Sequence, residues 1–260
     1  MDILNFIGGT HRPAVEGGWL ENIEPATGHA YGRLPRSESA DVELAMEAAG
    51  AAYPGWSATP VEDRAACLNR LADRIAAHFD ELVAAESRDN GKPVGLAAHV
   101  DIPRAEKNLR FYASAAQQYL TEAGMAAGAD QLHYVHRKPL GTVGVISPWN
   151  LPLYLFTWKV APALAMGNCV IGKPSEVTPA TAYLMSQWIN EAGFPPGSFN
   201  IVHGLGHEVG EALVTHPRIK AISFTGGTAT GQHIARAVAG TSKKTTFELG
   251  GKNPAIIFED

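Results

Sequence analysis

The stretch from Leu140 to Glu176 reads LGTVGVISPWNLPLYLFTWKVAPALAMGNCVIGKPSE, and it decides the fold class. An apolar run ends in the sequence SPWN at 147–150, a helix-length apolar segment follows, and a second apolar run ends in KPSE at 173–176. Strand, helix and strand in this order are typical of a βαβ unit. Because ligands bind at the carboxyl ends of parallel strands, we expect a nucleotide-type site at these two strand ends.

The rest of the chain continues this alternation of strands and helices. Residues 1–36 are rich in Gly, Pro and Asn and are expected to form small strands and turns. Further strands are expected near residues 133–137, 143–147, 169–172, 199–202, 220–224 and 245–248, and at the apolar run 255–258. The pattern predicts an α/β fold in which a parallel sheet carries helices on both faces.

Helix start signals occur in the first half of the chain. Ser39 is expected to cap one helix, and Thr59 is expected to cap another whose apolar series runs through 68–82. A further helical stretch covers 94–120, and Pro103 either kinks this helix or lies in the first turn of a new one.

The composition is that of an ordinary globular protein, with 45% hydrophobic and 18% charged residues among 260. The net charge of −5, with no basic run longer than two residues, argues against nucleic acid or an anionic membrane as a partner. Two cysteines form no disulfide framework, which favours a reducing, cytoplasmic location. No uninterrupted apolar run is long enough to span a membrane, and the N-terminus lacks the pattern of a signal peptide.

Two glycine-rich segments, 203–210 and 224–231, each follow an expected strand and lead into a helix. Glycines allow the backbone to approach a phosphate closely, and a helix N-terminus offers free N–H groups to its negative charge. The alternative is that glycine only serves the strand-to-helix turn, as it does in many α/β proteins. Two such segments beside the KPSE sequence favour the phosphate-binding interpretation.

Four polar residues are candidates for chemistry. Lys173 and Glu176, three residues apart after a strand, could both bind a ribose, or they could form an ordinary surface ion pair. Asn150 could donate to a developing oxyanion or serve as a turn residue. Glu248, in an expected apolar setting, could be a general base with a raised pKa or a charge at the end of a strand.

The two cysteines and a histidine pair are better explained without a function. Cys67 falls on the apolar face of an expected helix and Cys169 falls inside an expected strand, so both are predicted to be buried structural thiols. His203 and His207 are separated by a glycine-rich turn and have no third ligand nearby, so we expect no metal site.

Four motifs, in their order and spacing, resemble the NAD(P)-dependent aldehyde dehydrogenase superfamily across nearly the whole chain. They are SPWNLP at 147–152, GNCVIGKPSE at 167–176, FTGGT at 224–228 followed by Gly231, and FELGGKNP at 247–254. Within that superfamily, ESRDNGKP at 86–93, DIPR at 101–104 and KNPAIIFED at 252–260 most resemble the 2-aminomuconic and 2-hydroxymuconic semialdehyde dehydrogenases.

The resemblance implies a Rossmann-like, NAD-binding domain portion over residues 1–260. It also implies a connection and β-hairpin extension at 121–141 used in oligomerisation, and a catalytic domain missing beyond residue 260. The implied activity of the full-length enzyme, a cytoplasmic homo-oligomer, is NAD-dependent oxidation of an aldehyde to its acid through a cysteine thioester. The implied substrate is a small-molecule aldehyde, specifically a dicarboxylic semialdehyde.

The resemblance also assigns roles to residues. Asn150 would be the oxyanion-hole amide, Glu248 the general base, and Arg104 the contact for the substrate carboxylate, although a helix-surface arginine remains the alternative for Arg104. Glu176 would repel the 2′-phosphate of NADP and so favour NAD. The residues implied for cofactor binding are Ile146, Ser147, Pro148, Trp149, Lys173, Ser175, Glu176, Gly206, Gly210, Phe224, Thr225, Gly226, Gly227, Thr228, Gly231, Leu249 and Gly250.

Two departures from the superfamily pattern matter. Gly227 stands where many relatives have Ser, which removes a hydroxyl contact to phosphate. The attacking cysteine lies beyond the Glu248 motif in relatives, and the sequence ends before reaching it. The alternative function is therefore a non-catalytic dinucleotide-binding fragment or assembly partner. The strand at 133–137 is expected to leave an exposed edge that invites aggregation.

Overall fold

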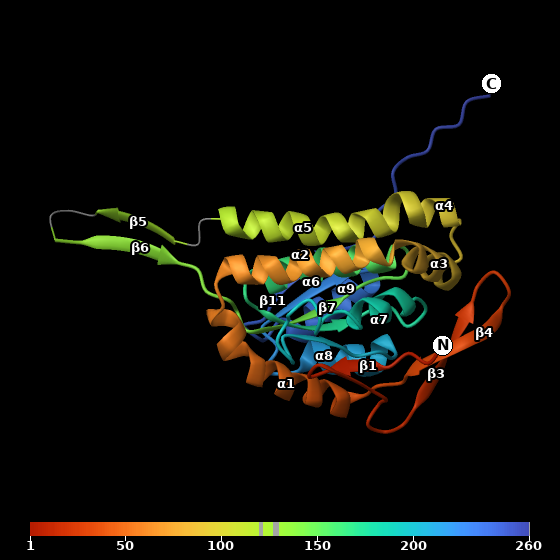
Figure 1. Ribbon diagram of the computed structural model, residues 1–260, viewed down its shortest axis with the longest axis horizontal. Coiled ribbons are helices and arrows are strands. Elements are labelled where there is room, and N and C mark those ends of the chain that lie inside the picture. The colour runs from red at the N-terminus through yellow and green to blue at the C-terminus, as the bar shows by residue number, and fades with distance from the viewer. Residues whose placement is uncertain (120–121, 127–129, 260) are drawn as a thin grey trace.

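A seven-stranded sheet forms the centre of the computed structural model, which describes residues 1–119, 122–126 and 130–259 (Figure 1). Five strands are parallel, and a short antiparallel hairpin extends the sheet at one edge. In spatial order the strands are β11 (Lys244–Glu248), β10 (Ala221–Thr225), β7 (Thr142–Ile146), β8 (Cys169–Lys173), β9 (Phe199–Ile201), β1 (Asn5–Ile7) and β2 (Thr10–Arg12). The predicted α/β class with a parallel sheet is confirmed.

The direction of the chain through the sheet reverses at β7. From β7 the chain builds β8 and β9 on one side, then crosses back and builds β10 and β11 on the other side. The carboxyl ends of β7, β8 and β10 lie together, because Ile146 is level with both Lys173 and Phe224. Such a reversal opens a crevice at the carboxyl edge of a parallel sheet, so this edge is the place to look for a ligand site.

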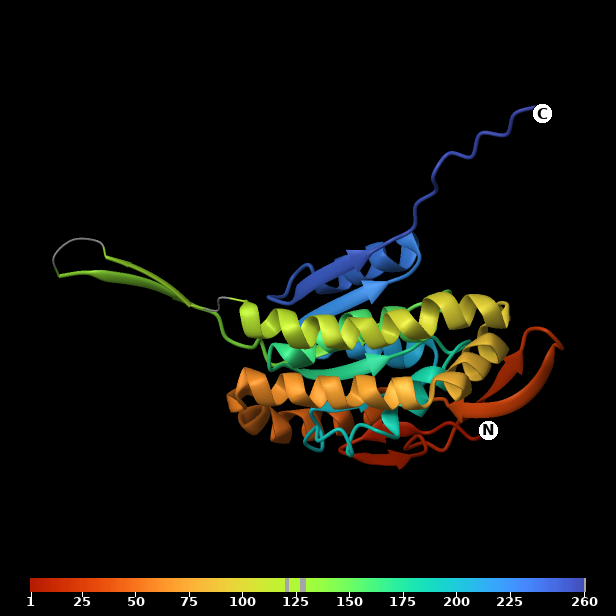
Figure 2. The same ribbon diagram turned by 45° about the horizontal axis from the view of Figure 1, so that its top comes forward.

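Helices pack against both faces of the sheet, as Figures 1 and 2 show. One apolar cluster joins the sheet to α2 (Val61–Ala77), α3 (Phe79–Asn90), α5 (Ile102–Gln118), α6 (Pro152–Ala165) and α7 (Ala180–Ser186). A second cluster, on the opposite face, includes residues of α1 (Ser39–Ala58), α8 (Glu211–Thr215) and α9 (Thr228–Val238).

Two glycines inside the strands allow helices to approach the sheet closely. A Cβ placed on Gly172 of β8 would lie 2.5 Å from the ring of Phe156 on α6. A Cβ on Gly144 of β7 would lie 3.1 Å from Leu213 of α8. Because Gly172 and Gly144 belong to adjacent central strands, they let α6 and α8 seat tightly on the strands that carry the site.

Two further hairpins lie outside the central sheet. The strands β3 (Trp19–Glu24) and β4 (His29–Pro35) form one. The strands β5 (Glu122–Ala126) and β6 (Leu132–His136) form the other, which extends away from the body in both views (Figures 1 and 2). Every described residue of β5 and β6 is exposed, including Leu132 and Tyr134, so no described part of the chain buries this hairpin.

Both predicted helix caps are wrong. Ser39 is the first residue of α1, and the capping position is held by Glu38, whose N–H donates to the Asp41 carboxylate at 3.1 Å. Thr59 ends α1, with its hydroxyl donating to the carbonyl of Gly55 at 3.0 Å, while Pro60 precedes the first turn of α2. In each case the capping position is one residue away from the one expected, and Pro60 makes no side-chain cap for α2.

Three other helix and strand predictions need adjustment. The apolar series 68–82 lies on two helices, because the chain breaks at His78, whose ring stacks on Trp188 at 4.4 Å. Pro103 lies in the first turn of α5, directly after the short α4 (Val94–Leu96) and a π-helical turn, η1 (Ala97–Asp101). The expected strand at 255–258 is absent from the described residues, and this segment runs outward from the sheet (Figure 2).

Candidate functional site

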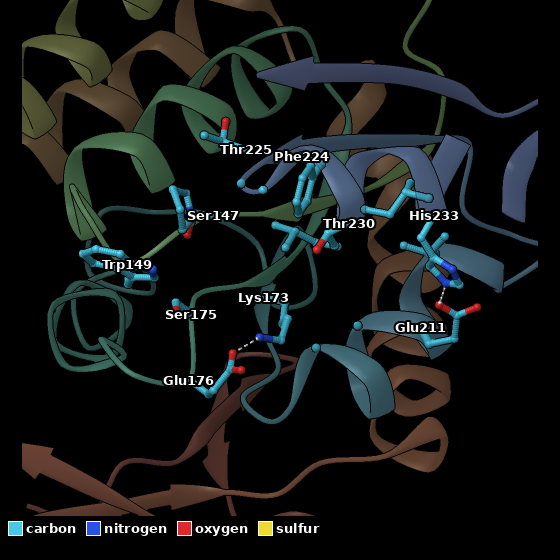
Figure 3. A pocket seen from close by; sticks show the side chains of 18 residues that line it. Ser147, Trp149, Lys173, Ser175, Glu176, Glu211, Phe224, Thr225, Thr230 and His233 are labelled. Carbon is cyan, nitrogen blue, oxygen red and sulfur yellow. Dashed lines mark hydrogen bonds and ion pairs between the residues drawn. The ribbon is translucent and has the colours of Figure 1, made fainter. Parts of the chain in front are cut away.

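Two cavities open at the carboxyl edge of the sheet. The first cavity lies between the ends of β7, β8 and β10 and the helices α8 and α9 (Figure 3). All the predicted cofactor residues line it except Thr228, Gly231, Leu249 and Gly250. In Figure 3, Trp149 lies on one side of this cavity and His233 on the opposite side, with Lys173 between them. The cavity is therefore elongated across the strand ends.

Lys173 and Glu176 form an ion pair in the middle of the first cavity, with Lys173 Nζ 2.7 Å from Glu176 Oε2. The Lys173 side chain is only 3% exposed, so this is no ordinary surface pair. Burial lowers the pKa of Lys173, and Glu176 opposes that shift. Burial alone would raise the pKa of Glu176, but the charge of Lys173 and its hydrogen bond hold that pKa below its usual value. The pair therefore places a cation and an anion side by side, ready to bind vicinal hydroxyls.

The glycine-rich turn after β10 leads directly into the N-terminus of α9. Gly227 precedes the first helical residue, Thr228, and has no side chain with which to cap the helix. A Cβ on Gly227 would meet nothing within 4 Å, whereas one on Gly226 would lie 2.5 Å from the Phe224 ring. The N-terminus of α9 is therefore not capped by a side chain, and it lies beside the cavity that Gly227 and Thr230 line, which suits an anion such as a phosphate.

The earlier glycine-rich segment forms a π-helical turn, η2 (Gly206–Gly210), that leads into α8. Gly210 lies beside the Lys173–Glu176 pair, since a Cβ added there would lie 3.7 Å from the Cδ atom of Lys173. Both glycine-rich segments therefore end beside the same cavity.

Ser147, at the end of β7, carries a buried hydroxyl with no hydrogen-bond partner among the described residues. Buried polar atoms in proteins are normally satisfied by a partner, which can be a ligand or a water. The orphan hydroxyl, the N-terminus of α9 and the Lys173–Glu176 pair together form a donor and acceptor set that fits a dinucleotide.

The second cavity adjoins the first and shares five lining residues with it: Pro148, Trp149, Thr225, Gly226 and Gly227. Its other lining residues include Asn150, Tyr154, Trp158 and Glu248, together with Leu249 and Gly250 from the predicted cofactor set. Asn150 and Glu248, predicted to act on the same reacting group, are thus brought to one cavity.

The loop that carries Asn150 is held by residues that the sequence analysis did not single out. Lys92 Nζ donates to the Asn150 carbonyl at 2.9 Å, and Asn90 Nδ2 donates to the Trp149 carbonyl at 2.6 Å. Lys92 also forms a buried ion pair with Asp101 at 2.8 Å. These contacts fix the backbone on either side of Asn150 and leave its amide at the cavity wall.

Glu248 ends β11 and is exposed, so the apolar setting expected for it is wrong. The buried titratable group nearby is Lys159 of α6, whose ammonium donates to the Ser223 hydroxyl at 3.1 Å. Burial lowers the pKa of Lys159 to about 8, and the charge of Glu248 opposes that shift. A lysine within the apolar segment LFTWKVAPALA was the available signal for Lys159.

Arg104, in the first turn of α5, lies against the second cavity through Tyr154. Its Nη2 donates to the Tyr154 hydroxyl at 3.1 Å, and its guanidinium carbon lies 5.1 Å from the centre of that ring. Tyr154 lines the second cavity together with Trp158. The structure therefore holds an exposed cation beside an aromatic wall of this cavity.

Neither cysteine lines either cavity. Cys169 is fully buried, and burial raises the pKa of its thiol to about 12. Cys67 is buried beside Arg70 and donates to the Gly193 carbonyl at 3.4 Å. Both are structural thiols in this fold, since nucleophilic cysteines need accessible thiolates.

Metal ligands and membrane spans are both missing from the described part of the chain. Residues 1–119, 122–126 and 130–259 contain no group of three His, Cys, Asp or Glu side chains placed to hold a metal ion. His203 is buried, and burial lowers its pKa to about 3. Over the same ranges, no helix combines the length and apolar character needed to cross a membrane.

Comparison with known proteins gives consistent matches over nearly the whole chain. The sequence pattern of the Aldehyde dehydrogenase family matches residues 13–260. The 2-aminomuconic semialdehyde dehydrogenase of Bos taurus is 49% identical over 98% of this chain and 52% of the relative. The 2-hydroxymuconic semialdehyde dehydrogenase of Pseudomonas sp. (strain CF600) is 46% identical over 100% of this chain and 54% of the relative.

Solved structures give the same result. An NAD+ complex of an aldehyde dehydrogenase from Bacillus cereus superposes with a TM-score of 0.95 at 38% identity, over 100% of this chain and 53% of that one. PnpE from Pseudomonas sp. WBC-3 gives a TM-score of 0.93 at 39% identity, over 96% of this chain and 51% of that one. The chain spans about half the length of the relatives it matches.

Proposed function

This chain belongs to the aldehyde dehydrogenase family, and from that premise we propose that it is the NAD-binding portion of an enzyme that oxidises an aldehyde to its carboxylic acid. The single observation that supports this most is the pair of adjoining cavities, which share the loop at 148–149 and the turn at 225–227. A dinucleotide in the first cavity and an aldehyde in the second would meet at this shared wall.

In this proposal, Lys173 and Glu176 hold the adenosine ribose, and the N-terminus of α9 faces the pyrophosphate. The bound NAD+ supplies a hydride acceptor. NAD is proposed over NADP because the 2′-phosphate would meet the Glu176 carboxylate and remove the hydroxyl that Glu176 binds.

The second cavity supplies the groups for carbonyl chemistry. Asn150 donates its side-chain amide to the oxyanion, and loss of one such donor typically costs about 3 kcal/mol of transition-state stabilisation. Glu248, exposed at the end of β11, takes a proton from the water that hydrolyses the thioester. In this proposal the thioester-forming cysteine is neither Cys67 nor Cys169, since both are buried and line neither cavity, and it belongs to another part of the protein.

We propose a dicarboxylic semialdehyde, such as 2-aminomuconic or 2-hydroxymuconic semialdehyde, as the substrate. Arg104 would bind its distant carboxylate, and the contact with Tyr154 supports this by keeping the guanidinium beside the second cavity. The names of the relatives agree with this substrate class.

The assembly proposed is a homo-oligomer in a reducing, cytoplasmic setting that suits two unpaired thiols. Residues 121–141 would act as its oligomerisation hairpin. The exposed apolar side chains of β5 and β6 support that role, because a second chain could cover them.

The cofactor proposal is tested by titrating the purified chain with NAD+ in a calorimeter. Lys173→Ala should weaken binding about 100-fold, because it removes a charged hydrogen-bond donor from the ribose and leaves Glu176 without its counter-ion. Lys138→Ala, an exposed lysine outside the first cavity, is the matched control and should bind as the wild type does. Equal affinity in both variants would exclude the ribose role.

The alternative, a chain that binds a dinucleotide without catalysis, is favoured for the isolated chain by its two buried thiols. We therefore expect no NADH from a semialdehyde and NAD+ in the presence of residues 1–260 alone. NADH formation above the protein-free blank, followed at its own absorbance band, would overturn the assignment of the nucleophile to another part of the protein.

A further inference from the structure

One part of the first cavity lies beyond the residues proposed to bind the ribose and the pyrophosphate. Beyond Lys173, the cavity continues between α8 and α9, where Val214 and Ile234 are buried and line it. Glu211, which is half-buried, and His233, which is exposed, line the same part. An apolar floor with a polar rim between two helices suits a flat heterocycle with a hydrogen-bonding edge.

Glu211 and His233 join the two helices through one hydrogen bond. His233 Nε2 lies 2.7 Å from Glu211 Oε2, and since a carboxylate only accepts, Nε2 is the donor. The other carboxylate oxygen of Glu211 takes no part in that bond. Both residues line the first cavity, so the pair places a negatively charged acceptor at its rim, with one carboxylate oxygen held by His233.

The Glu211 carboxylate lies on a definite side of the Lys173–Glu176 pair. Glu211 comes directly after Gly210, and both Gly210 and Lys173 line the first cavity. Figure 3 places Glu211 and His233 on the side of Lys173 opposite to Trp149, and Trp149 belongs to the wall shared with the second cavity. A dinucleotide whose nicotinamide reaches the shared wall must direct its other base toward Glu211 and His233.

On the basis of the cofactor site proposed above, we propose that Glu211, oriented by His233, is a specificity-determining residue that recognises the exocyclic amino group of the adenine base. A carboxylate oxygen accepts a hydrogen bond from that amino group. Hypoxanthine carries a carbonyl oxygen at the same position, and this oxygen would face the carboxylate without a proton between them. A site built around such a bond disfavours the analogue that lacks the donor, by a modest factor here because the Glu211 and His233 side chains are 39% and 60% exposed.

The competing explanation is that the pair only links α8 to α9. Exposed ion pairs contribute little to stability, and a purely structural pair would not distinguish the two bases. Glu43 and His216 provide the internal comparison, because His216 Nε2 lies 2.9 Å from Glu43 Oε2 outside the first cavity, where Glu43 also pairs with Arg218.

The experiment is calorimetric titration of the purified chain with NAD+ and with nicotinamide hypoxanthine dinucleotide, which differ only in the base. We expect the wild type to bind NAD+ about tenfold more tightly. Glu211→Gln should reduce that ratio to about twofold or less, because an amide can donate to the hypoxanthine oxygen as well as accept from adenine. Glu43→Gln should keep the tenfold ratio, and His233→Ala should reduce it in part.

Equal affinity of the wild type for the two dinucleotides would overturn the inference and leave the cofactor site intact. An unchanged ratio in a folded Glu211→Gln variant, with folding checked by circular dichroism, would do the same. Failure of the wild type to bind either dinucleotide would overturn both this inference and the proposed cofactor site.

Discussion

The first and second cavities share a wall, yet they differ in how their polar groups are held. In the first cavity, Lys173 is almost fully buried and is paired with Glu176. In the second, Glu248 is exposed, and the aromatic residues Trp149 and Trp158 are 59% and 41% exposed. Buried, paired groups keep their geometry without help, whereas exposed groups depend on a substrate or further protein to fix them. We therefore expect cofactor binding to be a property of this chain alone and carbonyl chemistry to need more.

The largest effect that would break this contrast concerns Lys92, a well-buried residue that supports the second cavity. Lys92→Met should lower the free energy of unfolding by about 3 kcal/mol, because it leaves the Asp101 carboxylate buried without its counter-ion. It should also free the Asn150 carbonyl that Lys92 holds. Urea unfolding followed by circular dichroism measures the change.

Arg110→Met is the matched control for that prediction. Arg110 also forms ion pairs, with Glu106 and Asp73, but it lies on the surface and its loss should cost about 0.5 kcal/mol. If Lys92→Met proves no more destabilising than Arg110→Met, Lys92 does not anchor the loop of Asn150 as described.

A smaller effect is expected in the first cavity, where Glu176 should set the preference for NAD+ over NADP+. Glu176→Gln should narrow the preference for NAD+ over NADP+ about tenfold, because it removes a negative charge from the position of the 2′-phosphate. The ratio of the two dissociation constants, measured at one ionic strength, gives the change. Glu208→Gln, whose carboxylate is instead paired with Arg36, is the control. A ratio that stays constant in Glu176→Gln would count against the ribose role.

The smallest expected effect concerns Lys159, the buried charge near the second cavity. Its pKa falls from 10.5 to about 8 in the folded chain, so between those values the unfolded chain binds more protons and stability rises with pH. Lys159→Met should therefore be more stable than the wild type at pH 7.5, by about 1 kcal/mol, and this advantage should shrink toward pH 10.

Urea unfolding at pH 7.5 and pH 10 tests this, with the exposed Lys138→Met as a control that should show no such trend. If the stability advantage of Lys159→Met over the wild type instead grows with pH, the pKa of Lys159 is not lowered in the folded chain.

The sequence predicts those features that are set by residues close together along the chain. The strands near 143–147 and 169–172 follow from local apolar runs, and the structure has them at Thr142–Ile146 and Cys169–Lys173. The cluster at the strand ends then follows from parallel topology alone. Recurring motifs supplied the family, which the matches over residues 13–260 confirm.

The features that the sequence could not predict are set by contacts distant along the chain. Lys92 and Asn90 hold a loop 58 and 59 residues away, and no local pattern indicates that pairing. The exposure of Glu248 depends on what packs over β11, whereas its own sequence FELGG suggested an apolar setting. The predicted caps at Ser39 and Thr59 are wrong by a single residue, since the capping positions are Glu38 and Pro60.

The reversal of the chain at β7 has a consequence for how the protein folds. Ile146 and Phe224 are neighbours in the sheet but are separated in sequence by all of β8, β9 and the helices between them. The first cavity therefore cannot exist until this long-range pairing closes, which is a slow type of step because the entropy of a large loop is lost first. NAD+ would bind only chains that have completed it, and at 100 times its dissociation constant would stabilise them by about 2.7 kcal/mol. The cofactor would thus act on the nascent protein as a folding ligand before it serves any reaction.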